Sequence, residues 1–177
     1  MIQLVITIVA IALTAALLAA SVNYLPWWHK YASDTESVVR ASAPLLEQAY
    51  DVVVREANGV APSVGGGADG GLMANFGSVL KLPPAAPKGF AWKYGVKSGG
   101  SAPWAGLNYF CLEYTDDAEG APVGAWQGLR RAAAVFSPQQ YVLGNSCGGT
   151  ASVGTPAEYP APLALTLYVA YTPGITR

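Results

Sequence analysis

The chain has 177 residues and a formal net charge of -1, and charged residues make up only 12% of it. Because this charge is close to zero and no basic patch stands out, the composition argues against nucleic acid as a partner. Hydrophobic residues make up 52% of the chain, which excludes general disorder. The chain is long enough for an N-terminal helix followed by one compact domain, and its 20 glycines and 13 prolines indicate many loops.

Residues 1–28 contain no Asp, Glu, Lys or Arg, and the first 22 are almost wholly apolar. A helix of 22 residues is about 33 Å long, which matches the hydrocarbon core of a bilayer. Aromatic and basic residues typical of a membrane–water interface follow: Tyr24, Trp27, Trp28, His29 and Lys30. We therefore expect residues 1–28 to form a transmembrane or filament-core helix in contact with membrane lipid. The alternative is a cleavable signal peptide, which the uncharged start and the long apolar run disfavour.

Small residues recur at close spacing in this first helix: Ala12, Ala15, Ala16, Ala19 and Ala20. Small side chains let helices approach closely in lipid or in a dry filament core. The spacing predicts an assembly face, although alanine is also common in membrane spans that only anchor a protein.

Residues 29–58 read as an amphipathic helix continuous with the first. Its apolar residues recur at spacings of three, four and seven: Val38, Val39, Leu45, Leu46, Ala49, Val52 and Val53. Asn58-Gly59 is a strong helix stop, because both residues tolerate the left-handed conformation. A continuous helix over 1–57 would be about 85 Å long, and Pro26 and Pro44 should each kink or locally unwind it.

Residues 59–177 predict a globular α+β domain. A loop spans 59–88 and contains one short helix over 72–82. Its glycine cluster, Gly65-Gly66-Gly67 and Gly70-Gly71, lacks the Gly-Lys-Ser/Thr of a phosphate loop, so a surface loop is favoured over nucleotide binding. Further along, the pattern predicts strands at 89–96, 107–114, 140–143 and 163–171, the last of them central, and a short helix over 123–136.

We expect an antiparallel sheet to pack on the amphipathic helix. The helix side of this contact should bury Val38, Leu45, Leu46, Ala49 and Val53. The domain side should bury Trp92, Phe110, Leu165, Leu167 and Val169. The fold class is therefore α+β, with a long kinked N-terminal helix on a small sheet.

No catalytic constellation is evident. The single histidine, His29, lies in the aromatic belt, and no group of His, Cys, Asp and Glu has metal-ligand spacing. The acidic cluster around Asp116 is typical of a solvated turn, with calcium binding as the alternative. Arg130-Arg131 could bind an anion or form the exposed face of the short helix. We expect no enzyme activity, no cofactor and no metal.

Two cysteines, Cys111 and Cys147, suggest one disulfide in an oxidising compartment, with two buried cytosolic thiols as the alternative. Lys30 and Arg40 follow the first helix, and the positive-inside rule would place them in the cytoplasm. The cysteines indicate the opposite side. A basic leader already removed from the front of the chain would resolve this conflict.

This organisation resembles the type IV pilin-like superfamily, in which a long helix, apolar and then amphipathic, precedes a loop, an antiparallel sheet and a disulfide-closed C-terminal region. Helices of this family often carry prolines near the positions of Pro26 and Pro44. Mature type IVb subunits can begin with Met after removal of a basic leader. The resemblance implies pilin-like subunits or pilus assembly proteins as partners of the N-terminal helix. It also implies location in a bacterial inner membrane with a periplasmic domain, or in an extracellular pilus.

One position departs from the family, which generally carries Glu at the fifth position where this chain has Val5. The departure favours a minor subunit or an accessory protein over a major pilin. The chain is also similar to the small PilM-type proteins of thin-pilus operons, through its WKYG, aromatic–Cys and WQGL segments and its late Cys-Gly. The alternative function is a membrane-anchored periplasmic binding or adaptor module outside pilus systems.

Overall fold

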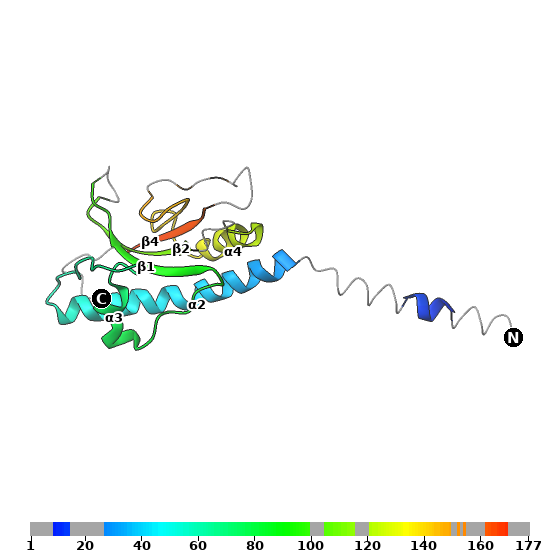
Figure 1. Cartoon of the computed structure of the whole chain (residues 1–177), viewed down its shortest axis with the longest axis horizontal. Helices are drawn as coiled ribbons and strands as arrows, with labels where there is room; N and C mark the ends of the chain where they lie inside the picture. Colours follow the sequence, from blue (N-terminus) through cyan, green and yellow to red (C-terminus); the bar gives the residue numbers. More distant parts are fainter. Residues whose placement is uncertain are drawn as a thin grey trace.

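The computed structural model describes residues 9–14, 27–99, 105–115, 121–149, 152, 154 and 162–169. The fold is α+β, as predicted: among the described residues from 27 onwards, one long helix and two short helices accompany a four-stranded sheet (Figure 1). In chain order the elements are α2 (Trp27–Glu56), α3 (Leu72–Leu80), β1 (Phe90–Val96), β2 (Asn108–Tyr114), α4 (Val123–Ala133), β3 (Tyr141–Gly144) and β4 (Ala164–Val169). Residues 9–14 are also helical. Each element of the domain lies where the sequence predicts it.

The sheet is antiparallel throughout, in the order β1-β2-β4-β3. β4 pairs with strands on both sides, which confirms its predicted central position. Trp92 lies opposite Leu112, which lies opposite Leu165, and Leu165 lies opposite Leu143. Because side chains alternate across a strand, this row belongs to one face, and all four of its residues are buried in the core.

α2 packs against this inner face of the sheet, with α4 alongside it and α3 on a different side (Figure 1). The helix side of the core includes Val39, Ala43, Leu46, Tyr50 and Val54, all fully buried. Leu46 and Ala49 are buried as predicted, and Val53 is half-buried against the core. The sheet residues Trp92, Phe110, Leu165 and Leu167 are buried as predicted, and Val169 is half-buried against them.

The prediction that Leu45 faces the core is wrong. Leu45 is 53% exposed, and Val52, from the same predicted stripe, is 40% exposed. Successive residues of a helix are about 100° apart, so Leu45 and Val52 lie on the opposite side of α2 from Tyr50. The helix is apolar on two faces, and only one of them can contact the sheet.

α2 ends at the predicted stop. Asn58 and Gly59 both have positive φ, at 53° and 88°. The Gly59 N–H donates to the Val54 carbonyl at 2.8 Å, and the Asn58 N–H donates to the Arg55 carbonyl at 3.1 Å. This pair of bonds is a Schellman motif.

The two predicted kink positions have different outcomes. Pro26 lies outside the described residues. Pro44 lies within α2, and the helix continues through it, so Pro44 does not unwind the helix locally.

Candidate functional site

The solvent-facing side of α2 carries apolar side chains that the domain leaves uncovered. Ala41, Leu45 and Val52 are exposed and recur at spacings of four and seven, so they lie along one line of the helix. We call these three residues the outer stripe. Pro44 lies beside them and is also exposed. A helix of 30 residues is about 45 Å long, so the stripe belongs to a rod that could contact another helix along its length.

α4 packs closely against the N-terminal part of α2. A Cβ added to Gly124 would lie 2.4 Å from the Trp28 carbonyl oxygen, and one added to Gly128 would lie 2.6 Å from that of Ala32. The two helices therefore meet backbone to backbone. Sequence reasoning missed this contact, although the spacing of Gly124, Gly128 and Ala132 is the signal of close helix packing. Trp126, Leu129 and Ala133 of α4 are buried as well.

The predicted interface belt is partly described. Trp27 is 68% exposed at the start of α2, and Lys30 is exposed one turn later. The rings of Trp28 and His29 stack with their centroids 3.5 Å apart, and both residues are half-buried. Tyr24 lies outside the described residues. Trp27 and Lys30 are therefore accessible from solvent, whereas Trp28 and His29 are partly covered.

Of the predicted assembly face, only Ala12 is described. It is exposed within the helical segment 9–14, beside the exposed side chains of Val9, Ile11 and Leu13. Ala15, Ala16, Ala19 and Ala20 lie outside the described residues. Among the helices that are described, none is both long and apolar enough to cross a bilayer.

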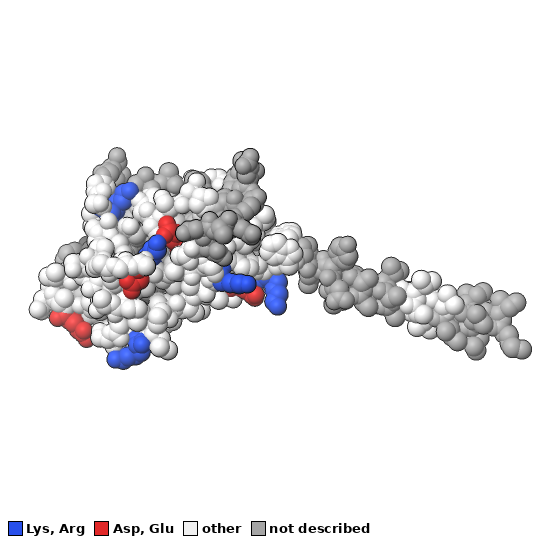
Figure 2. All heavy atoms as spheres, in the orientation of Figure 1, with Lys and Arg blue, Asp and Glu red and all other residues white. Residues whose placement is uncertain are grey.

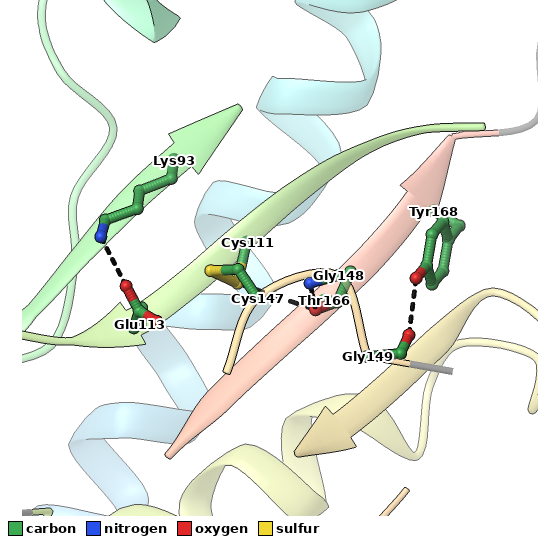
Figure 3. The surroundings of a disulfide bond; sticks show 8 residues. All are labelled: Lys93, Cys111, Glu113, Cys147, Gly148, Gly149, Thr166 and Tyr168. Carbon is green, nitrogen blue, oxygen red and sulfur yellow. Dashed lines mark hydrogen bonds and ion pairs between the residues drawn. A yellow bond between two sulfur atoms is a disulfide. The ribbon is translucent and has the colours of Figure 1, made fainter. Parts of the chain in front are cut away.

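The predicted disulfide joins Cys111 in β2 to Cys147, with the two Cα atoms 5.7 Å apart (Figure 3). It holds the segment after β3 against the outer face of the sheet. The Gly148 N–H donates to Thr166 Oγ1 at 3.0 Å, and the Tyr168 hydroxyl donates to the Gly149 carbonyl at 2.6 Å. Lys97 Nζ donates to the Gly148 carbonyl at 2.6 Å. Side chains of β4 and Lys97 thus fix the same turn that the disulfide pins.

Burial raises the pKa values of titratable side chains in the domain. Burial raises the pKa of Tyr31 to about 12, and its hydroxyl donates to the Lys88 carbonyl. The pKa of Glu47 on α2 is also raised, mainly by burial and to a smaller extent by the charge of Asp51. Within the part of the chain that the structure describes, no three His, Cys, Asp or Glu side chains gather to hold a metal ion. The acidic cluster at Asp116 falls in the undescribed connection between β2 and α4.

The glycine cluster forms a hydrogen-bonded turn against β1. The Asp69 carboxylate accepts the N–H groups of Gly71 and Met73, each at 3.0 Å, and so caps the start of α3. The Tyr94 N–H donates to the Asp69 carbonyl at 3.0 Å. A Cβ on Gly70 would lie 2.0 Å from the Tyr94 carbonyl oxygen. The glycine here permits close approach of two backbones, which supports the expected surface loop.

Comparison with known proteins finds no matching family model, no matching curated protein and no matching solved structure.

Proposed function

We propose that this chain is a non-enzymatic structural or assembly component of a type IV pilus system, a pilin-like subunit anchored and assembled through its N-terminal helix. The observation that carries the proposal is the outer stripe. A helix that only supports a sheet needs one apolar face, yet α2 keeps Leu45 and Val52 exposed on the other. Exposed apolar residues in line along a rod are typical of a surface that packs against another helix.

The uncharged segment 1–28 adds to this proposal. It leads directly into α2, whose first two residues it includes, and is apolar enough for a membrane or a filament core. The domain would then lie in the periplasm or on a pilus surface, both oxidising environments in which the Cys111–Cys147 disulfide persists. The partners would be other pilin-like subunits, or assembly proteins, together with membrane lipid.

The test compares charged substitutions on and off the outer stripe. Leu45→Glu and Val52→Glu should each strongly reduce incorporation into surface filaments, because a carboxylate cannot be buried unpaired between helices. Leu82→Glu and Val135→Glu are the matched controls, because these residues are at least as exposed but lie on other parts of the domain. The measurement is the amount of chain in sheared filaments relative to the amount in the membrane fraction, in bacteria that lack the unsubstituted copy.

A second arm tests the N-terminal helix. Ala16→Leu or Ala19→Leu should abolish incorporation while leaving membrane insertion and the disulfide intact. Normal incorporation of both outer-stripe variants would contradict the proposal. Full function after replacement of residues 1–22 by an unrelated apolar span would favour a membrane-anchored periplasmic adaptor instead.

A further inference from the structure

A groove runs along the exposed side of α4. It has a volume of about 370 Å³ and is lined by Trp126, Gln127, Arg130, Arg131 and Ala134. These positions are spaced by one, three, one and three residues, so they form one surface of a helix. From Trp126 to Ala134 the groove extends about 12 Å at 1.5 Å per residue, which is the length of three or four residues of extended chain.

The groove offers hydrogen-bond donors with positive charge. The Arg130 guanidinium carbon lies 5.1 Å from the centre of the Trp126 ring, a cation–π contact that fixes its position. Arg131 is exposed beside it. Within the described ranges, ion pairs join Arg40 to Glu36 and Lys93 to Glu113, and no carboxylate pairs with Arg130 or Arg131.

A buried donor without a partner lies at the same place. Trp126 is 6% exposed, and its indole N–H donates to no acceptor among the described residues. A buried donor left unpaired is costly. At the surface of the groove itself, two guanidinium groups lie side by side on the helix, and the lining contains no acidic side chain.

We propose that this groove binds an acidic peptide segment of a partner protein, with the carboxylates held by Arg130 and Arg131. Guanidinium groups are planar, always charged and matched in shape to carboxylates. The residues that line the groove follow one another along α4 from Trp126 to Ala134, so a short extended segment can lie along them. Figure 2 shows one face of the molecule, over which charged side chains are few and scattered. This inference goes beyond pilus assembly and does not depend on it.

The experiment uses the full-length chain in nonionic detergent and a fluorescein-labelled hexaglutamate peptide, with binding followed by fluorescence anisotropy at low and at physiological salt. The wild-type chain should bind hexaglutamate and not bind hexaglutamine. Arg130→Gln/Arg131→Gln should weaken binding at least tenfold. Arg130→Lys/Arg131→Lys should weaken it less, because charge is kept while the planar fork is lost. Both arginines are exposed, so these variants should keep the wild-type circular dichroism spectrum.

The matched control removes two positive charges elsewhere. Arg55 and Lys88 are exposed and lie outside the groove, so Arg55→Gln/Lys88→Gln should bind hexaglutamate within about twofold of wild type, because distant exposed charges are screened. Equal loss in this control would show general charge attraction and overturn the proposal. Failure of the wild-type chain to bind hexaglutamate would also overturn it. So would full displacement of the peptide by equimolar inorganic phosphate or glycerol phosphate, which would indicate a free phosphate or lipid headgroup site.

Discussion

Replacing Gly128 by alanine should destabilise the protein, although helix propensity alone predicts the opposite. Alanine is about 1 kcal/mol better than glycine inside a helix. At this position, however, the new Cβ would lie 2.6 Å from the Ala32 carbonyl oxygen and 2.7 Å from Thr35 Cβ, whereas ordinary contact begins at 3.4 Å. The carbonyl belongs to the backbone of α2, so a side-chain rotation cannot relieve the overlap.

The structure sets the size of the effect. The shortfall is about 0.8 Å (3.4 minus 2.6), so α4 must move away from α2 along their shared interface. Overpacking of this kind costs about 1–3 kcal/mol. After the propensity gain is subtracted, we expect Gly128→Ala to lower the free energy of unfolding by about 1 kcal/mol, and by more if Leu129 is displaced from the core.

Gly77 provides the matched control. It also lies inside a helix, α3, but a Cβ there would find its nearest atom, Met73 Cε, at an ordinary 3.7 Å. Gly77→Ala should therefore stabilise the chain by up to about 1 kcal/mol. Urea unfolding of the full-length chain in nonionic detergent, followed by circular dichroism, measures both variants. Stabilisation of both by similar amounts would refute the close α2–α4 contact.

Three further predictions concern the core, the disulfide and the helix cap. Leu46→Ala should cost about 2–5 kcal/mol of unfolding free energy, whereas Leu45→Ala on the exposed face should cost less than about 0.5 kcal/mol. Equal losses in urea unfolding would contradict the burial of Leu46 and the exposure of Leu45. Replacing Cys111 and Cys147 by serine should lower the free energy of unfolding by about 3–4 kcal/mol on the chain-entropy estimate for a separation of 36 residues. An unchanged denaturation midpoint would show that the disulfide does not stabilise the fold. Hydrogen bonds, chiefly from the Met73 N–H, lower the pKa of Asp69. The ionised Asp69 carboxylate therefore stabilises the folded chain above its unfolded pKa of about 3.9, and this stabilisation is lost as the pH falls through the lower folded pKa. The stability difference between wild type and Asp69→Asn should therefore shrink on acidification through this range, and a difference independent of pH would contradict the capping role.

The sequence alone determined the order and type of the elements, because each depends on local chemistry. The apolar periodicity of α2 and the Asn58-Gly59 stop are properties of neighbouring residues, and so is the alternation of β1 and β2. The pairing of Cys111 with Cys147 also followed, because the chain contains only these two cysteines.

Tertiary structure decided which face of α2 enters the core. Leu45 and Leu46 are chemically identical, and no local rule distinguishes them. Leu46 is buried because it lies on the side of α2 that forms the core with the sheet. Nearer the start of α2, α4 can lie close only because Gly128 presents no side chain to Ala32. The outer stripe and the basic groove on α4 are what this packing leaves uncovered, and a surface left over by packing depends on contacts between segments far apart in the chain.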